Sequence, residues 1–192
     1  MKRIILLSFV SMLLSVGTTM AEGISSAREL VAFATAANAG EDITPWADRE
    51  GVISLTADID MAKVKDFVPI AVFDGIFDGG CHTISNWKTT AGLFHIVSEK
   101  AVVRNLTIDA SCSMKCTDNG EEEFYAGFIA DVNHGTLEGC INRGQISHRS
   151  GKSLMSNYVG GICGMNKYIV INCDNYGNVS SNTIGTKTNI MP

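Results

Sequence analysis

The sequence predicts a mainly β protein, a parallel β-helix (a solenoid of short strands) with a short capping helix at its N-terminal end. Two observations lead to this prediction. After Glu50 the chain consists of short apolar runs of period two bounded by Gly, Asn or Asp, which is typical of short strands joined by tight turns. The pattern also recurs: Gly92, Gly127 and Gly161 lie 35 and 34 residues apart. A repeat of roughly 20 to 50 residues is typical of solenoids and propellers.

The composition fits one globular domain and excludes several classes of protein. The 192 residues are 45% hydrophobic, which is too many for a disordered chain. The 20 acidic and 15 basic residues give a net charge of −5, and the Lys and Arg residues do not cluster along the sequence. Because a nucleic-acid-binding protein needs a basic face, we expect no nucleic-acid partner.

Residues 1–21 have the pattern of a cleaved signal peptide. A basic start at Lys2 and Arg3 precedes an apolar run over 4–16, and small residues suitable for cleavage follow at 19–21. A membrane anchor is the alternative, but the run is shorter than the roughly 20 residues that a span needs. We therefore expect a secreted or cell-surface protein with no transmembrane segment after cleavage.

A helix is expected in the lead-in region 22–50. Ser26 and Glu29 have the spacing of a capping box, in which each side chain binds a free backbone N–H of the first turn. An apolar stripe at helical spacing follows, made of Leu30, Phe33, Ala34 and Ala37. Asn38 and Gly40 are typical of a helix end. The stripe must cover apolar surface, and the end of the solenoid is the expected place.

The repeat domain is expected over 51–192, with about three short strands in each turn of the coil. The clearest strands are 52–56, 83–85, 93–96, 102–103, 106–108, 128–130 and 168–171. Ile171 is expected to face the core. Two longer excursions, 110–125 and 147–158, leave from the same phase of the repeat. Because successive turns of a solenoid stack, both excursions are expected on the same side.

The repeat also carries a family resemblance. The stretch FDGIFDGGCHTISNW at 73–87, with the later segments AGLF, RNLTID, YVGGICGMN and INCDNYGNV, resembles secreted bacterial repeat proteins with the GLUG motif. The resemblance covers most of 24–185. It implies a right-handed parallel β-helix at the surface of a bacterium, with an adhesin-like role. Gly80 and Cys81 depart from the family's pattern, which commonly has Asn and Gly at these positions.

Four aromatic residues are candidates for ligand binding. Trp46 and Trp87 have side chains suited to stacking on sugar rings; the alternative is that Trp46 packs beside the helix and Trp87 at a corner of the coil. Phe124 and Tyr125 follow the acidic run DNGEEE in the first excursion and form a candidate recognition edge.

Acidic residues and histidines do not form a catalytic pattern. Four aspartates lie in or beside expected turns, where an Asp side chain binds its own backbone: Asp58, Asp60, Asp74 and Asp78. Carboxylates for sugar hydrolysis or for Ca²⁺ are the alternative interpretation. His82 is expected as a hydrogen-bonding residue at a corner. We therefore predict no catalytic residue, no metal site and no cofactor.

Six cysteines in an exported chain suggest disulfides. Cys112 and Cys116, four residues apart in the first excursion, are the best disulfide candidates. Cys140 and Cys173 occupy the same phase of the repeat, so we expect them about 5 Å apart on adjacent turns. Stacked free thiols and a disulfide between the turns both fit that spacing.

Together these features favour a β-helix module with adhesin-like binding of a glycan or of a host or bacterial surface protein, without catalysis. A structural fragment of a longer surface stalk is the first alternative, because an open last turn exposes strand edges and promotes end-to-end self-association. A polysaccharide-acting β-helix enzyme, a lyase or a hydrolase, is the second alternative.

Overall fold

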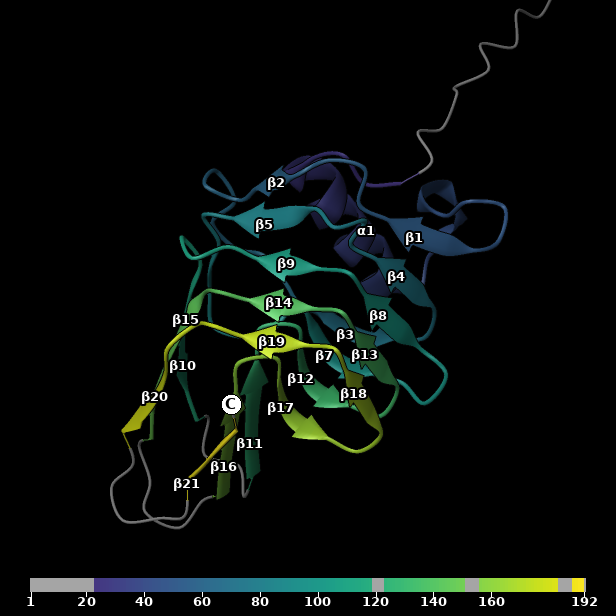
Figure 1. The fold of residues 1–192 in the computed structure, drawn as a ribbon. Helices are drawn as coiled ribbons and strands as arrows, with labels where there is room; N and C mark the ends of the chain where they lie inside the picture. Colours follow the sequence, from purple (N-terminus) through teal and green to yellow (C-terminus); the bar gives the residue numbers. More distant parts are fainter. Residues whose placement is uncertain (1–22, 119–122, 151–155, 183–187, 192) are drawn as a thin grey trace, which may run out of the picture.

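The computed structural model describes residues 23–118, 123–150, 156–182 and 188–191. The expected signal peptide lies outside these residues. The described chain is mainly β and coils through five sheets in which every strand pair is parallel (Figure 1). This confirms the predicted solenoid of parallel strands. No helix among the described residues is long and apolar enough to cross a membrane.

The chain visits the five sheets in a fixed order, and we number them in that order. The first sheet holds β1 (Val52–Ser54), β4 (Ile76–Asp78), β8 (Val102–Arg104), β13 (Thr136–Glu138) and β18 (Ile169–Ile171). The second holds β2 (Ile59–Asp60), β5 (Thr83–Ser85), β9 (Thr107–Ile108), β14 (Ile141–Asn142) and β19 (Asp174–Asn175). The third holds β6 (Lys88–Thr89), β10 (Ser113–Thr117), β15 (Gln145–Arg149) and β20 (Val179–Asn182). The fourth holds β11 (Glu123–Gly127), β16 (Ser156–Gly160) and β21 (Thr188–Met191), and the fifth β3 (Ile70–Phe73), β7 (Phe94–Val97), β12 (Ala130–Asn133) and β17 (Cys163–Asn166).

The described parts of the two excursions contain strands, which the sequence does not predict. β10 pairs with β15, and β11 pairs with β16, so the excursions stack in register on the same side of the coil. We call these six strands, β10, β15, β20, β11, β16 and β21, the fin; in Figure 1, β10 and β15 lie on the left side, and β20, β11, β16 and β21 lie toward the bottom. The first turn passes through three sheets, as predicted, the second through four, and the turns β8–β12 and β13–β17 through five.

The interior of the fin explains why its two sheets stay together. Met114, Cys116, Ile146 and Val159 are buried, and the ring of Phe124 on β11 stacks on His148 of β15 at a centroid distance of 4.9 Å. Inward and outward side chains alternate along β10 and β15, as they do in any strand with one buried face.

The helix α1 (Ala27–Ala39) covers the N-terminal end of the coil, as predicted (Figure 1). Ser26 Oγ accepts a hydrogen bond from the Glu29 N–H, and the helix ends at Gly40 in the left-handed conformation. The Glu29 carboxylate binds Ser25 rather than Ser26, which shifts one half of the capping box by a residue. Phe33 is buried and packs against Phe73 and Phe77. The stripe therefore closes the end of the aromatic core.

One corner of the coil repeats the same backbone geometry in successive turns. Asn105, Gly139 and Asn172 occupy the same place after β8, β13 and β18, and all three have φ between 53° and 59°. Asn and Gly are the residues that adopt this left-handed conformation at least cost. A second repeated corner joins Asn142 to Asn175, whose side chains hydrogen-bond at 2.8 Å between turns. The Asn- and Gly-rich sequence is therefore a consequence of repeated corners.

The register corrects the expected orientation of Ile171. Ile171 pairs with Glu138 and lies in the outward row, with 47% of its surface exposed. Its neighbour Val170 pairs with Leu137, which is fully buried, so Val170 is the residue that faces inward. The tight left-handed corner at Asn172 follows Ile171 directly, and a one-residue difference in the position of a corner reverses which side chains face the core.

This register predicts different costs for two similar truncations. Leu137→Ala removes a fully buried side chain and should lower the free energy of unfolding by about 2–5 kcal/mol. Ile171→Ala, the matched control on the outward row, should cost less than about 1 kcal/mol. Urea unfolding of both variants measures the difference. Equal losses would contradict the register.

Candidate functional site

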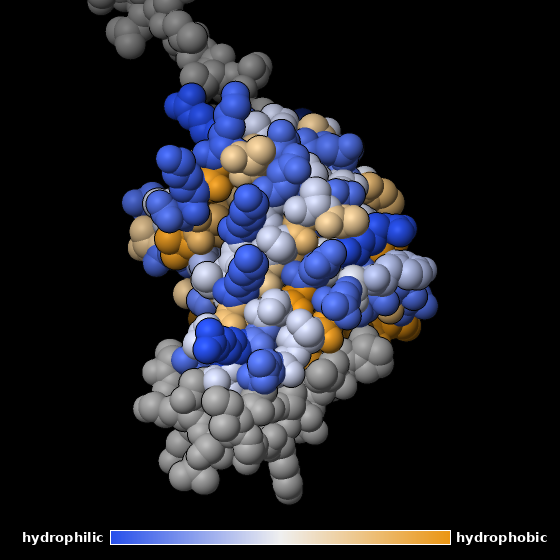
Figure 2. Space-filling model, turned by 90° about the vertical axis from the view of Figure 1, so that its left-hand side faces the viewer, coloured by the Kyte–Doolittle hydropathy of each residue, from blue (hydrophilic) through white to orange (hydrophobic). Residues whose placement is uncertain are grey.

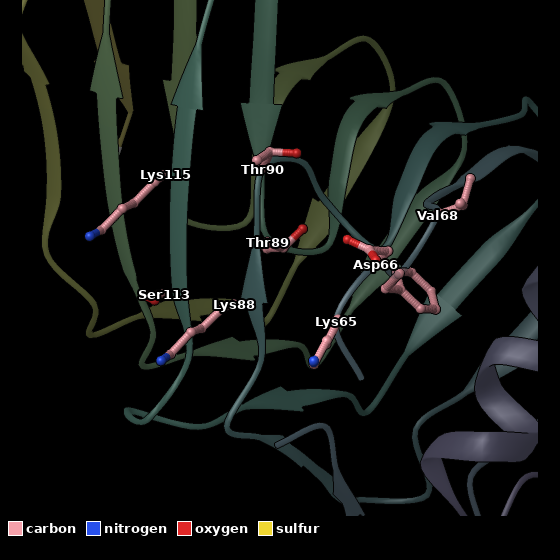
Figure 3. A pocket seen from close by; sticks show the side chains of 9 residues that line it. Lys65, Asp66, Val68, Lys88, Thr89, Thr90, Ser113 and Lys115 are labelled. Atoms are coloured by element: carbon pink, nitrogen blue, oxygen red, sulfur yellow. The ribbon is translucent and has the colours of Figure 1, made fainter. Parts of the chain in front are cut away.

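Two neighbouring hollows on the outer surface form the candidate site. The larger one, which we call the lysine groove, has a volume of about 460 Å³ and is lined by Lys65, Asp66, Phe67, Val68, Lys88, Thr89, Thr90, Ser113 and Lys115 (Figure 3). The smaller one, the His95 hollow, has a volume of about 250 Å³ and is lined by Thr90, Ala91, His95, Ile96, Glu123, Phe124, Tyr125, Asp131 and Val132. Thr90 lines both, so the two hollows adjoin.

Strand register places two of the three lysines on one face. Lys88 of β6 pairs with Ser113 of β10, and Lys115 follows Ser113 by two residues. Residues two apart on a strand point to the same side, so Lys88 and Lys115 both face outward. Lys65 comes from the segment between β2 and β3, and Figure 3 shows the three ammonium groups pointing to the same side of the ribbon.

The charge of the groove is positive and largely unneutralised. Asp66 is the one acidic residue in its lining, against three lysines. In the described part of the chain, the ion pairs join other residues: His82 with Asp58, His95 with Asp131, and Arg104 with Asp78. The lysines thus face solvent as positive charges in a chain of net charge −5.

The remaining lining adds hydroxyl groups and an apolar wall. Thr89, Thr90 and Ser113 supply hydroxyls, which both donate and accept hydrogen bonds. Val68 is 65% exposed, and the half-buried ring of Phe67 packs edge-on against Trp87 at 5.4 Å. Figure 2 shows that the side of the molecule on the left of Figure 1, where β10 and β15 lie, is predominantly hydrophilic with scattered apolar side chains.

The His95 hollow is built around a buried carboxylate. The Asp131 side chain is only 8% exposed and accepts hydrogen bonds from the backbone N–H groups of Gly92, at 3.1 Å, and Gly127, at 3.3 Å. Its second oxygen lies 2.5 Å from His95 Nδ1. A Cβ atom at Gly92 would lie 2.3 Å from the Gly127 carbonyl oxygen, so this close approach requires glycine there. The recurring glycines of the sequence therefore help to build the site.

The pairing shifts the pKa of both partners. The hydrogen bond to Asp131 raises the pKa of His95, and the attraction between the two charges adds to this effect. Burial raises the pKa of Asp131, while hydrogen bonds from His95, Gly92 and Gly127 oppose that rise. The imidazole, 47% exposed, is thus held by one nitrogen at the mouth of the hollow.

An aromatic wall from the fin borders this hollow. Tyr125 of β11 stacks on Tyr158 of β16 at 5.2 Å, and its hydroxyl donates a hydrogen bond to Glu123. This bond raises the pKa of Tyr125 to about 12. Tyr125 is half-buried, and of the four aromatic candidates it is the one that presents a hydroxyl and a ring beside a hollow.

The other aromatic candidates lie elsewhere. Trp87 is 1% exposed and packs against Phe67 and Phe128, so the structure corrects its expected role as a sugar platform. Trp46 is half-buried and packs edge-on against Phe33 beside the helix. Phe124 is half-buried, with its ring stacked on His148 inside the fin, although its edge reaches the lining of the His95 hollow.

Two of the four early aspartates, Asp60 and Asp78, bind their own turn as predicted, whereas Asp58 and Asp74 bind residues of the next turn of the coil. Asp60 and Asp78 accept backbone hydrogen bonds from the residues two positions ahead, Ala62 and Gly80. Asp58 binds the Thr83 N–H and also His82, which therefore lies at a corner as expected. Asp74 accepts from the Ser98 hydroxyl. In the described part of the chain, no three His, Cys, Asp or Glu residues come together as a metal site.

The expected disulfide between Cys112 and Cys116 is not formed. Both are free, buried thiols: Cys116 lies on the inward face of β10, and Cys112 directly precedes that strand. Residues four apart along a strand are separated by about 13 Å, well beyond the roughly 7 Å that a disulfide spans. Cys140 and Cys173 stack on adjacent turns as predicted, with the Cys140 N–H 3.3 Å from Cys173 Sγ, and both are free thiols.

The lysines and the His95–Asp131 pair were missed in the sequence, for physical reasons. Lys88 and Lys115 share a face only because the early turns are shorter: β6 pairs with β10 at an offset of 25 residues, whereas β10 pairs with β15 at an offset of 32. His95 and Asp131 pair because the segment between Gly127 and the start of β12 is one residue longer than the segment between Gly92 and the start of β7. A search at one fixed period does not bring either set together.

No family model and no curated protein matches the chain. One solved structure is similar to it, a crystal structure described as that of a putative immunoglobulin A1 protease from Bacteroides ovatus. The two share 19% sequence identity with a TM-score of 0.45, over 73% of this chain and 57% of that protein. The chain thus spans a little over half the length of that protein, and a likeness of this size says nothing about what the chain does.

The free thiols predict a specific pattern of alkylation. With no reductant present, iodoacetamide should modify the exposed Cys81 quickly in the native protein and leave Cys116 unmodified. Burial raises the pKa of Cys116 to about 12, so its reactive thiolate is scarce as well as inaccessible. After denaturation, still without reductant, mass spectrometry should find Cys112 and Cys116 both alkylated. Their failure to react would show a disulfide.

Proposed function

We propose that the chain is a secreted or cell-surface β-helix module that binds an acidic polysaccharide in the lysine groove, without catalysis. The observation that supports this most is the convergence of Lys65, Lys88 and Lys115 on one hollow whose lining holds a single acid. Sulfate and carboxylate groups are the natural partners of such ammonium groups. The signal-peptide pattern and the resemblance to GLUG-motif proteins, with their right-handed coils, favour the same location.

The uncharged part of the groove favours a sugar over other anions. Thr90 and Ser113 lie among the lysines of the lining and match the hydroxyls of a sugar ring, while Phe67 and Val68 offer apolar contact for its CH groups. A nucleic-acid-binding surface neutralises many successive phosphates and needs a broad basic face. Three lysines in a chain of net charge −5 fit a short charged stretch of polysaccharide better.

Affinity electrophoresis tests the proposal with a matched pair of polymers. The full chain should be retarded in native gels that contain dextran sulfate and should migrate normally in gels that contain neutral dextran. An exposed ion pair contributes up to about 1 kcal/mol, so each of Lys88→Ala and Lys115→Ala should weaken apparent binding up to about fivefold. The double variant should lose more, and added salt should weaken binding of the wild type.

Lys100→Ala is the control, because it removes an exposed lysine of the β7–β8 turn and leaves the groove intact. Equal loss in this control, or no retardation by dextran sulfate, would contradict the proposal and favour a protein partner. A cleared track in the polysaccharide stain would indicate an enzyme.

A structural role through self-association is the second candidate, favoured by the last turn of the first sheet. Ile169 and Val170 of β18 are each 38% exposed, and Tyr168 beside them is 62% exposed. Val170 continues the inward row of Leu137, so it presents core-type apolar surface at that end of the coil.

Sedimentation tests this second candidate. If turns stack end to end, the average mass of the full chain should rise with concentration. Val170→Lys should suppress that rise, whereas Ile171→Lys on the outward row should leave it nearly unchanged. A constant monomer mass at the highest concentrations would rule out this route of assembly.

A further inference from the structure

The His95 hollow adjoins the lysine groove but differs from it in the source of its charge. The groove carries permanent positive charge, whereas the hollow carries a histidine. A ligand that fills the groove and continues past Thr90 enters the hollow, because Thr90 lines both. The charges in the hollow therefore decide whether a chain-like ligand binds more tightly or more weakly when it extends into the hollow.

One of the two nitrogens of the His95 imidazole is available to a ligand. His95 Nδ1 is engaged by Asp131, and Nε2 has no hydrogen-bond partner among the described residues. Because Asp131 is tied by the N–H groups of Gly92 and Gly127 as well, the ring is held by a fixed support. When His95 is protonated, Nε2 becomes an oriented N–H donor with positive charge at the mouth of the hollow.

The charged groups around His95 are few. On the neighbouring strands, Ala71 of β3 and Asp131 of β12 lie beside His95. Beyond Asp131, the next strand, β17, has Gly164 at the same position. The wall from β11 adds Glu123, hydrogen-bonded to Tyr125. With His95 neutral, the hollow thus holds two carboxylates and no positive charge. An anionic group is then repelled.

We propose that the His95 hollow is a second subsite for the acidic polysaccharide, one that accepts an anionic sugar residue only when His95 is protonated. This inference rests on the proposed function of the lysine groove. The subsite makes binding depend on pH: the lysine groove binds the polysaccharide at any pH near neutrality, while the subsite adds affinity as the medium becomes more acidic.

The direction of the pH effect follows from the pair itself. The hydrogen bond to Asp131 raises the pKa of His95 above its usual value of 6.5, and burial of the ring offsets only part of that rise. The protonated form binds the anion, so affinity should increase as the pH falls through that raised pKa. Sulfate esters remain ionised throughout this range, so dextran sulfate itself does not titrate.

The test is a binding titration of the full chain with dextran sulfate between pH 8.5 and 5.5. Wild-type affinity should rise by up to about fivefold on acidification, which is the most that one solvent-exposed ion pair contributes. His95→Gln should remove most of this rise. His82→Gln is the matched control, because His82 also pairs with an aspartate, Asp58, but at a corner outside the hollow; it should keep the wild-type rise.

A second variant covers the case in which His95→Gln does not fold. Glu123→Gln removes a carboxylate from the hollow and leaves the His95–Asp131 pair intact, so affinity at pH 8.5 should increase. A wild-type rise that survives His95→Gln, or its absence from the wild type, would overturn the subsite.

The lysine variants separate the two hypotheses. Lys88→Ala with Lys115→Ala should lower affinity at every pH and keep the fold-increase on acidification. If that double variant binds as well as the wild type while His95→Gln abolishes the rise, the groove proposal fails and the subsite stands. If the double variant loses affinity and neither protein responds to pH, the groove proposal stands and the subsite fails.

Discussion

The structure depends on backbone hydrogen bonds that join each turn of the coil to the next. At the corner after the first sheet, the same backbone bond recurs from turn to turn: Gly79 N–H to the Arg104 carbonyl, Asn105 to Glu138, and Gly139 to Ile171, at 2.7–3.0 Å. A parallel strand pairs with its neighbour only if every corner closes in the same way. The constraint therefore falls on the corners, where left-handed residues recur, mostly Asn and Gly but also Cys81.

The same stacking places the functional groups. A side chain on an outward row has its neighbour in the next turn about 5 Å away, so residues far apart in sequence form short rows of like orientation. Lys88 and Ser113 are neighbours in one such row, which lines the lysine groove. His95 and Asp131 are neighbours in another row, where the imidazole hydrogen-bonds the buried carboxylate. The strand β11 of the fin contributes the aromatic wall of the His95 hollow, and the strands of the fin stack in the same way.

The sequence predicts the parts of the fold that are local or strictly periodic. The cap at Ser26, the parallel coil and the stacked Cys140 and Cys173 follow from spacing alone. What the sequence does not reveal depends on turn lengths that vary: a turn without the fin is shorter, so the partner of Lys88 cannot be found by a fixed offset. The burial of Trp87 likewise depends on Phe67, which comes from an irregular segment.

An acidic polysaccharide bound as proposed would contact the lysine groove and the His95 hollow as one continuous surface. The most direct measurement is an amide NMR titration of the labelled chain at pH 6 with a short sulfated dextran fragment. The largest shift changes are expected at Lys88, Thr90, Lys115 and His95, with the strands β18 and β19 unaffected. Changes concentrated on β18 and β19, with none around Thr90, would contradict the proposal.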